Sequence, residues 1–278
     1  MRVKDFVAFI NARERHRIAK ETGKPPRNPD PIISEYRFCN VRRNDDRVTK
    51  WIFGHYLARW RDNPDLWFAL VVARLFNREE TLEDIMPFVI PFWPDAMRRT
   101  LHDRVASGLK VFNAAYIVST NGIAKNKIDY LVENVLTPMW QSRVDIRRLV
   151  NVGQLANAHI ALSDLNGLGS FMAAQVLADL KYAHPTRWED FHTFAASGPG
   201  SRRGLNRVCG FKTGQPWRES HWRAMLGALR DRTNAKLKME PLTAHDIQNC
   251  LCEFDKYERV RLGEGYPKQL YKPKGDGE

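Results

Sequence analysis

The sequence has 278 residues, 43% of them hydrophobic, which is enough for one large domain or two small ones with a sizeable core. Its 44 Lys and Arg outnumber its 32 Asp and Glu and give a formal net charge of +12, a balance that favours an anionic partner such as DNA or RNA. There is no apolar run of about 18 residues and no signal peptide at the N-terminus, so we expect a cytoplasmic protein that does not enter a membrane.

Hydrophobic spacing and capping residues predict helices along almost the whole chain. In chain order these helices cover residues 2–21, 44–61, 66–77, a short segment from 81, 95–107, 126–140, 142–162, 217–232 and 243–262. Residues 110–122 fit either a helix or a short strand, and residues 198–204 fit a glycine-rich loop. No pattern typical of strands recurs, so the predicted fold class is all-α.

The chain divides by composition into three predicted regions. Residues 1–30 form an N-terminal helix followed by a proline-rich loop, and residues 31–262 form a helical catalytic domain. Residues 263–278 form a basic tail with few apolar residues, which we expect to be extended.

The most informative segment is residues 162–180, LSDLNGLGSFMAAQVLADL. It predicts two helices joined by a turn at Asn166, Gly167, Gly169 and Ser170, because each glycine costs about 1 kcal/mol in a helix interior. A glycine turn that opens a helix presents free backbone N–H groups, which bind phosphate. We therefore predict a helical hairpin that contacts the DNA backbone through these four residues. The alternative is an ordinary helical turn.

Two segments after the hairpin carry candidate catalytic and phosphate-binding groups. Asp190 and His192 offer a carboxylate and an imidazole that can accept a proton. Residues 197–207, SGPGSRRGLNR, combine a glycine-shaped backbone with forked arginine donors. The phosphate-binding candidates in this segment are Gly198, Gly200, Ser201, Arg202 and Arg203. The segment is no Walker loop, because it lacks G-K-[ST]. The alternatives are a surface Asp and a plain loop with exposed arginines.

Residues 36–51, YRFCNVRRNDDRVTKW, supply candidate substrate-binding residues at Arg43, Asp46 and Arg47. The arginines precede or begin a helix, near the end where anions are favoured. The alternative is a capped helix with solvated ion pairs. The four cysteines form no C-x-x-C pair and the eight histidines no H-x-x-x-H pair, so we predict no metal site and no cofactor.

The hairpin and Asp190 resemble the helix-hairpin-helix of the DNA glycosylase superfamily (HhH-GPD). In that superfamily a catalytic aspartate follows the second hairpin glycine at a spacing close to that between Gly169 and Asp190. Its lyase-type members carry a lysine where this chain has Phe171. The resemblance implies a two-lobed helical fold, in which a helical barrel surrounds the hairpin and both chain ends form the second lobe.

A more specific resemblance rests on FCNVRRNDDRVTKW, LNGLGSFMAAQVLADL, SGPGSRRGLNR and NCLCEFDKYERVRLGEGYPK. Over about residues 30–272 the chain resembles the α-glutamyl/putrescinyl thymine pyrophosphorylase family of bacteriophages and some bacteria. That family acts on thymine analogues in DNA that carry a pyrophosphorylated 5-hydroxymethyl group, and replaces the pyrophosphate with an amine. The 5-hydroxymethyluracil DNA kinases are a closely related helical family.

This resemblance implies a transferase in the cytoplasm of an infected host, with two partners: DNA carrying a modified thymine, and an amino acid such as glycine, or putrescine. Asp190 or His192 would take the proton of the amine. The backbone and arginines of residues 198–203 would hold the pyrophosphate, and Arg43 or Arg47 the carboxylate of an amino acid. Base flipping would expose the reacting carbon. The alternatives are a monofunctional DNA glycosylase, a 5-hydroxymethyl-deoxyuridine DNA kinase and a non-catalytic DNA-binding module.

Overall fold

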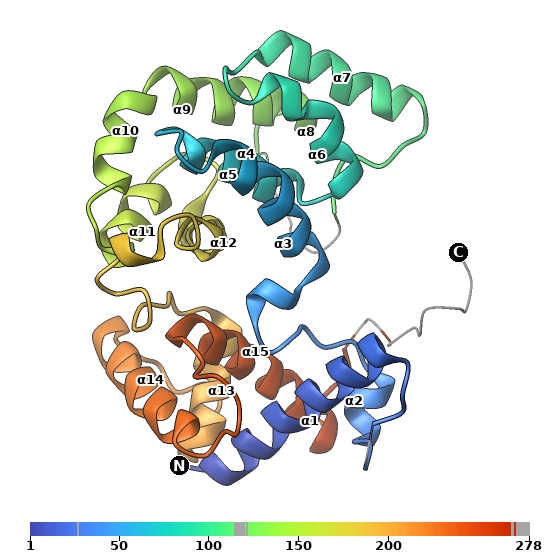
Figure 1. Cartoon of the computed structure of the whole chain (residues 1–278), viewed down its shortest axis with the longest axis vertical. Coiled ribbons are helices and arrows are strands. Elements are labelled where there is room, and N and C mark those ends of the chain that lie inside the picture. Colours follow the sequence, from blue (N-terminus) through green and yellow to red (C-terminus); the bar gives the residue numbers. More distant parts are fainter. Residues whose placement is uncertain (27, 114–119, 121, 268–269, 271–278) are drawn as a thin grey trace. The chain divides into compact units, whose positions relative to one another are not determined.

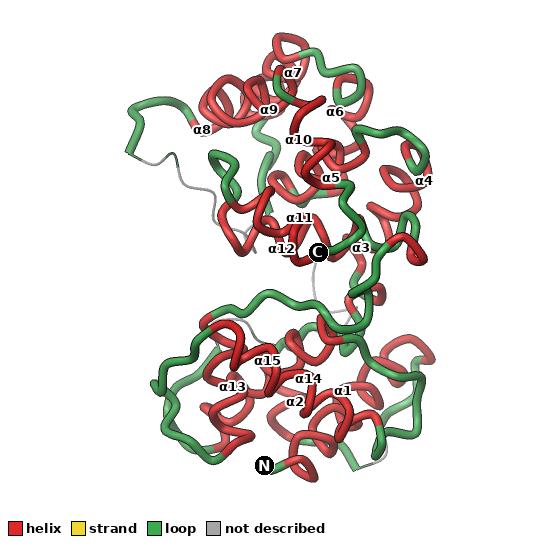
Figure 2. The backbone as a smooth tube through the Cα atoms, turned by 90° about the vertical axis from the view of Figure 1, so that its left-hand side faces the viewer, coloured by secondary structure: helices red, strands yellow, loops and turns green. Residues whose placement is uncertain are grey.

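The computed structural model describes residues 1–26, 28–113, 120, 122–267 and 270. Within these ranges the secondary structure consists of helices, which Figures 1 and 2 show, and one isolated β-bridge between Tyr36 and Leu270. The predicted all-α class is therefore confirmed for the described part of the chain. Most of the ambiguous segment 110–122 and most of the tail from 263 lie outside the described residues.

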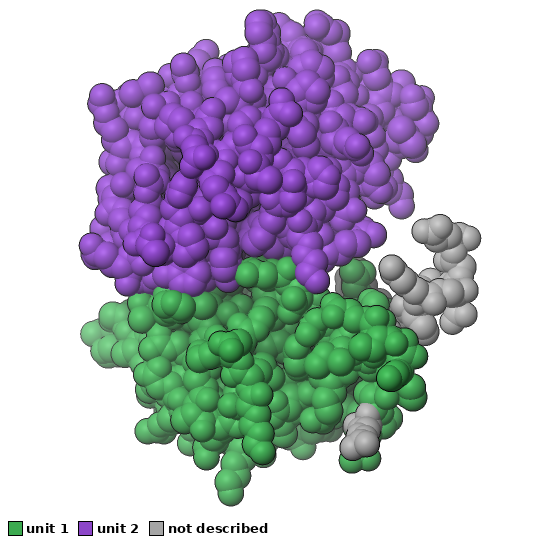
Figure 3. All heavy atoms as spheres, viewed as in Figure 1, with its two compact units in different colours: residues 1–46, 192–278 green, residues 47–191 purple. Residues whose placement is uncertain are grey.

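The chain folds into two compact units, coloured separately in Figure 3. Unit 1 consists of residues 1–46 and 192–278, so both chain ends belong to it. Unit 2 consists of residues 47–191 and contains the glycine hairpin. These units are defined by packing, and the three predicted regions 1–30, 31–262 and 263–278 stay a prediction. No helix among the described residues has the length and apolar character needed to cross a membrane.

Unit 1 packs its helices around an aromatic and aliphatic core. The helices are α1 (Val3–Thr22), α2 (Pro31–Glu35), the 3₁₀ turn η1 (Arg43–Asp45), α13 (Pro199–Cys209), α14 (Glu219–Asn234) and α15 (Ala244–Arg261). Phe6 and Ile10 of α1, Trp222 of α14 and Phe254 of α15 are at most 1% exposed. The N-terminal helix is thus part of the core of unit 1, because its apolar side is buried against the C-terminal helices.

Helices α13 and α15 pack so closely that their backbones are in contact. A Cβ atom at Gly204 would lie 2.0 Å from the carbonyl oxygen of Leu251, and one at Gly200 would lie 3.3 Å from the Sγ of Cys252. The prediction of a loop at residues 198–204 is therefore wrong. These residues begin the helix α13 instead. Pro199 stands at its first position, where proline is tolerated, and the two glycines permit the close packing against α15 without breaking the helix.

Unit 2 surrounds one buried helix, α5 (Leu66–Phe76), whose residues are all buried. The other helices are α3 (Arg47–Ile52), the π-helical η2 (Phe53–Leu57), α4 (Ala58–Trp60), α6 (Glu79–Ile85), η3 (Met86–Phe88), α7 (Pro94–Ala106), α8 (Lys127–Asp129), the π-helical η4 (Tyr130–Leu136), α9 (Thr137–Gln141), α10 (Arg143–Val150), α11 (Leu155–Ser163), α12 (Gly169–Leu180) and η5 (Pro185–Arg187). A helix whose sides are almost all apolar belongs in a core, and α5, which is apolar except for Arg74, forms the centre of unit 2.

The predicted single helix over 142–162 is wrong, because the chain forms two helices, α10 and α11, there. Gly153 has a φ of +78°, a left-handed conformation that a continuous α-helix does not contain. This break turns α11 so that it packs against both α10 and α12. It therefore creates the first helix of the hairpin as a separate element.

Candidate functional site

The predicted hairpin forms between α11 and α12 in unit 2 (Figure 1). Gly167 has a φ of +85°, and a Cβ atom there would lie 2.7 Å from the Cγ2 of Val135. Only glycine meets both conditions, since other residues rarely adopt this φ and the neighbouring side chain leaves no space. Gly169 has a φ of +59° with open space around it. The turn is thus held against η4 at Gly167 and exposed at Gly169.

Hydrogen bonds fix the hairpin from both sides. The Nδ2 of Asn166 donates to the carbonyl oxygen of Asn134 at 2.9 Å. The Nε2 of His159 on α11 lies 3.0 Å from the carbonyl oxygen of Ser170 on α12. The side chain of Asn166 therefore positions the turn, whereas Gly169 and Ser170 remain exposed at the N-terminus of α12. The first backbone N–H groups of a helix have no partner within the helix, so this exposed end can accept a phosphate.

An ion pair inside unit 2 anchors the second hairpin helix. Arg74 on α5 and Asp179 on α12 are 1% and 0% exposed, and the guanidinium donates to both carboxylate oxygens. The same guanidinium also donates to the side-chain oxygen of Asn77 at 3.1 Å and to the hydroxyl of Thr49 at 3.0 Å. Because the charges are buried and bonded on several sides, α12 has a fixed position relative to the central helix.

The structure places Asp190 at the N-terminus of α11. Its Oδ1 accepts the backbone N–H of Leu155 at 2.7 Å, and its Oδ2 accepts that of Ala156 at 3.0 Å. This carboxylate caps the helix, and the partial positive charge of a helix N-terminus favours an anion there. His192 belongs to unit 1, where its carbonyl oxygen accepts the N–H of Ala244 and a guanidinium N–H of Arg230, each at 2.9 Å. The structure thus assigns these two catalytic candidates to different units.

The predicted phosphate-binding segment is the first turn of α13 in unit 1. The hydroxyl of Ser201 is buried and bonds the N–H of Gly198 at 2.9 Å and its carbonyl oxygen at 3.0 Å. Gly200 packs against Cys252. Burial raises the pKa of the Cys252 thiol to about 12, so the thiol is protonated at neutral pH and is no nucleophile.

Arg202 and Arg203, the two arginines predicted to bind phosphate, both have carboxylate partners. Arg202 donates to Glu219 at 2.8 Å, to the hydroxyl of Ser197 at 2.9 Å and to the carbonyl oxygen of Trp217 at 2.9 Å. Arg203 donates its Nε–H to Asp255 at 2.8 Å. A phosphate would have to displace these partners of Arg202, whereas Arg203 makes one contact through its Nε–H and its side chain is 42% exposed. The role of both residues in pyrophosphate binding stays a prediction.

The segment before α3 lies along α15. The backbone N–H of Arg43 donates to Asp246 at 3.4 Å, and Asp46 accepts the N–H of Asn40 at 3.4 Å. Parts of three segments singled out in the sequence, 36–51, 197–207 and NCLCEFDKYERVRLGEGYPK, thus meet in unit 1, where Glu253 accepts the N–H of Cys39 and Asp255 that of the Arg203 side chain. Arg47 belongs to unit 2, where its guanidinium lies 3.1 Å from Glu79 with 83% of the side chain exposed. The substrate-binding roles of Arg43, Asp46 and Arg47 remain predictions.

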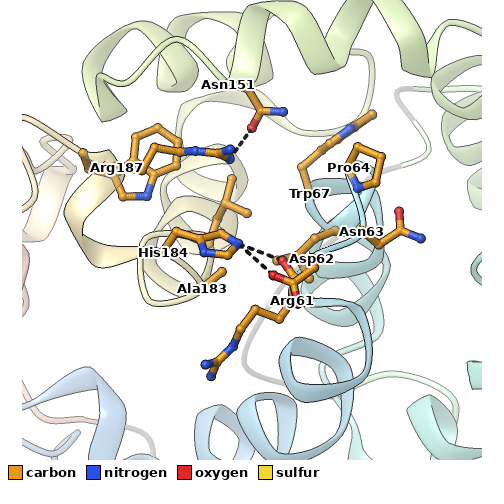
Figure 4. Close-up of a pocket in the computed structure, with 12 residues that line it drawn as sticks. Arg61, Asp62, Asn63, Pro64, Trp67, Asn151, Ala183, His184 and Arg187 are labelled. Atoms are coloured by element: carbon orange, nitrogen blue, oxygen red, sulfur yellow. Dashed lines mark hydrogen bonds and ion pairs between the residues drawn. The ribbon is translucent and has the colours of Figure 1, made fainter.

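Sequence reasoning missed a pocket of about 140 Å³ in unit 2, shown in Figure 4. Its walls come from the loop before α5, the end of α12 and the segment that follows α12. Trp67, His184, Arg187 and Trp188 are among its lining residues. None of them belongs to a recognised motif, because the pocket forms only when chain segments far apart in sequence meet. No group of three or more His, Cys, Asp or Glu suited to a metal occurs among the described residues.

These features define an all-helical protein of two units, with a glycine hairpin in one and a set of arginine–carboxylate contacts in the other. The chain belongs to the family described as "5-hmdU DNA kinase, helical domain", whose model matches residues 1–266. It is similar to a 5-hmdU DNA kinase of Bacillus phage SP10, with 34% identity over 228 residues. The matched region covers 72% of this chain and 35% of that kinase. No solved structure matches.

Proposed function

We propose that this chain modifies a thymine-derived base in phage DNA, in the cytoplasm of the infected host, by replacing a pyrophosphate on the 5-methylene carbon with an amine. Membership of the 5-hmdU DNA kinase helical family supports a substrate derived from 5-hydroxymethyl-deoxyuridine. The observation that carries DNA binding is the exposed start of α12 at Gly169 and Ser170. The net charge of +12 supports the same partner.

The limited match to the phage kinase favours two reactions that are catalysed by different protein regions. Phosphoryl transfer needs a site for a nucleoside triphosphate, and this sequence has no Walker loop. The 228 aligned residues span about a third of the kinase, so most of that protein has no counterpart in the alignment. We assign formation of the pyrophosphate ester, in which a nucleoside triphosphate supplies two phosphoryl groups to the hydroxymethyl oxygen, to the unmatched part of the relative, and the subsequent substitution to the helical chain.

The proposed reaction breaks one bond and forms one. The bond between the 5-methylene carbon and the pyrophosphate oxygen breaks, and pyrophosphate leaves with the bonding electrons. The lone pair of the amine nitrogen forms the new C–N bond, and the nitrogen then loses a proton to a base. The pyrimidine ring can delocalise positive charge from the methylene carbon, so the enzyme chiefly has to position the reactants and stabilise charge.

We propose an electrostatic role for Asp190, which the two backbone hydrogen bonds at the start of α11 support. A carboxylate held in this way can stabilise a positively charged carbon or ammonium. His192 is the second candidate for accepting the amine proton. Base flipping on a scaffold like that of the HhH-GPD glycosylases fits both the hairpin and the contribution of the two chain ends to one unit.

Two other activities have specific support. Membership of the family of 5-hmdU DNA kinases favours a kinase that uses 5-hydroxymethyl-deoxyuridine in DNA. The hairpin followed by Asp190 favours a monofunctional glycosylase, which would leave an abasic site. Phe171 stands where lyase-type members of the superfamily carry a lysine, which is compatible with a monofunctional glycosylase.

The test is release of pyrophosphate without any nucleoside triphosphate. The purified chain is incubated with duplex DNA containing 5-pyrophosphomethyl-deoxyuridine, with and without an amine, and free pyrophosphate is measured. We expect release that depends on the amine. Activity that appears only with ATP and 5-hydroxymethyl-deoxyuridine DNA would identify a kinase instead.

A further inference from the structure

The segment that opens unit 2, residues 47–61, carries exposed cations and no carboxylate of its own. Its sequence, RVTKWIFGHYLARWR, contains three arginines, one lysine and one histidine, and no Asp or Glu. Its helical part consists of α3, η2 and α4 in direct succession (Figure 1). The four cationic residues and the histidine are all exposed. A surface of this kind attracts an anionic partner.

The opposite side of this segment is fixed in the interior of unit 2. Thr49 is 1% exposed, and its hydroxyl accepts a hydrogen bond from Arg74 at 3.0 Å. Tyr56 is 0% exposed, and its hydroxyl donates to the carbonyl oxygen of Leu82 at 2.9 Å. Because these buried hydrogen bonds hold the inner side, the exposed side has a fixed position on unit 2.

An aromatic pair lies on the exposed side. The rings of Trp51 and His55 stack, with their centroids 4.2 Å apart and an angle of 13° between their planes. The Nδ1 of His55 lies 2.8 Å from the carbonyl oxygen of Trp51, and because a carbonyl oxygen only accepts, Nδ1 donates and holds the imidazole against the indole. A Cβ atom at the neighbouring Gly54 would have no atom within 4 Å. An exposed aromatic pair held in this way offers a surface on which a nucleobase can stack.

The cations of this segment differ in their contacts. The guanidinium of Arg47 lies 3.1 Å from Glu79, with 83% of the side chain exposed. The guanidinium of Arg59 lies 5.5 Å from the ring centroid of Trp60 and has no ion pair with a carboxylate among the described residues. Asp62 directly follows the segment and leaves the whole stretch cationic. Arg59 is therefore a cation that can take a phosphate without giving up a carboxylate partner.

We propose that this side of unit 2 binds a single strand of DNA, with an unpaired base stacked on the pair of Trp51 and His55 and the adjoining phosphates at Lys50 and Arg59. A single strand fits this surface because its bases have free faces, whereas those of a duplex are stacked on their neighbours. Extrusion of a base from a duplex creates such an unpaired strand. The choice of DNA as the partner rests on the proposed function.

The experiment measures binding of the full chain by fluorescence anisotropy to a short labelled oligothymidylate, to the same oligomer with abasic sites in place of the thymidines, and to an oligouridylate. The oligothymidylate should bind about fivefold to a hundredfold more tightly than the abasic oligomer, because stacking is lost in the latter. His55→Glu removes the ring, adds a negative charge and should weaken oligothymidylate binding about tenfold or more. His55→Phe keeps a ring and should bind within about twofold of the wild type.

Arg59→Gln tests the phosphate contact. In this variant the slope of the logarithm of the binding constant against the logarithm of salt concentration should fall by about 0.7, the value for one contact on a single strand. The matched controls are Arg148→Gln, at an exposed arginine of α10 in the same unit that pairs with Asp145 at 3.3 Å, and His221→Glu, at an exposed histidine of α14 in unit 1. Both controls should bind like the wild type.

Four results would overturn the proposal: equal losses in the variants and their controls, equal losses in His55→Phe and His55→Glu, equal binding of the abasic oligomer, or tighter binding of the oligouridylate. Amine transfer by a protein whose strand binding is unchanged in His55→Glu and Arg59→Gln would overturn this surface alone. Strand binding as expected without any amine transfer would overturn only the proposed function.

Discussion

Asp190 combines a structural contact with a proposed chemical role. Its two carboxylate oxygens accept the N–H groups of Leu155 and Ala156, so substitution affects both α11 and the charge. Asp190→Asn replaces one acceptor with an NH₂ group that cannot accept an N–H. We expect a stability loss of about 1 kcal/mol, as for a lost helix cap, and a decrease in turnover of about a hundredfold, as for a lost transition-state stabiliser.

Thermal denaturation and amine transfer rate check this prediction in the same preparation. Glu189→Gln is the matched control, because Glu189 is the neighbouring exposed carboxylate and bonds the side chain of Gln154 at 2.8 Å. It should keep the turnover of the wild type. If Asp190→Asn loses stability but keeps full turnover, Asp190 is only a helix cap.

Glu258 makes the stability of unit 1 depend on pH. Burial alone would raise the pKa of this carboxyl, but hydrogen bonds from Arg261 and Arg2 outweigh it and the pKa is lowered. A lowered pKa means that the unfolded chain binds the proton first as pH falls. The stabilisation is therefore complete above the ordinary pKa of a glutamate and is lost from about pH 5 downwards.

Glu258→Gln should reduce stability at pH 7 and weaken this dependence on acid, because Arg2, which directly precedes α1, loses its charged partner on α15. Chemical denaturation at several pH values between 3 and 7 measures both effects. Asp145→Asn removes an exposed ion pair with Arg148 and should change stability by less than about 0.5 kcal/mol. An identical acid dependence in Glu258→Gln and the wild type would contradict this account.

At the scale of elements, the contact between α13 and α15 depends on Gly204. A Cβ atom there would lie 2.0 Å from the carbonyl oxygen of Leu251, so Gly204→Ala should separate the two helices and cost about 3 kcal/mol. Gly227→Ala is the matched control, since Gly227 lies inside α14 with no atom within 4 Å of its would-be Cβ. It should stabilise the protein by about 0.5–1 kcal/mol. Equal effects of the two substitutions in urea denaturation would contradict the packing described here.

The hairpin prediction concerns the exposed start of α12. Gly169→Glu places a negative charge where a DNA phosphate is expected, and should lower DNA affinity about tenfold or more. For the wild type, the logarithm of the binding constant should fall with the logarithm of salt concentration by about one unit for each phosphate contacted. Fluorescence anisotropy with labelled duplex DNA measures both quantities.

Gly108→Glu controls for the charge and for the backbone strain. Gly108 is also exposed, has a φ of +71° and has open space around it, in the same unit. DNA affinity should be close to that of the wild type in this variant. Equal losses in the two variants would show that net charge alone, and not the hairpin, determines binding.

At the scale of the whole molecule, the sequence allowed the helical class and the hairpin to be predicted because both depend on local signals. Periodic apolar residues mark helices such as α5, and Gly167 marks a turn. The helix at Pro199–Cys209 was missed because Gly200 and Gly204 look like loop residues until the packing of α15 is known. The pocket was missed for the same reason, since the residues that line it, Trp67 and Trp188 among them, come from segments far apart in the sequence.

The pyrophosphorylase family that the chain resembles and the 5-hmdU DNA kinase that it matches both concern a base altered at the 5-methyl carbon of thymine, and we propose a substrate of the same kind for this chain. The two families differ in the reaction that their names give them, pyrophosphate displacement in one and phosphorylation in the other.

The contacts of Arg202 and Arg203 with Glu219 and Asp255 were not predictable from the segment SGPGSRRGLNR, because the partners lie on α14 and α15. Pyrophosphate binding by these arginines therefore remains a prediction that an activity measurement has to test.

The most direct test of the proposed transfer is the mass of the nucleosides after reaction. DNA containing 5-pyrophosphomethyl-deoxyuridine is incubated with the protein and either glycine, glutamate, putrescine or no amine, then digested and analysed by mass spectrometry. The account predicts a nucleoside in which the amino acid has replaced pyrophosphate, formed without ATP. Recovery of an abasic site, or of a phosphorylated nucleoside only when ATP and 5-hydroxymethyl-deoxyuridine DNA are supplied, would contradict it.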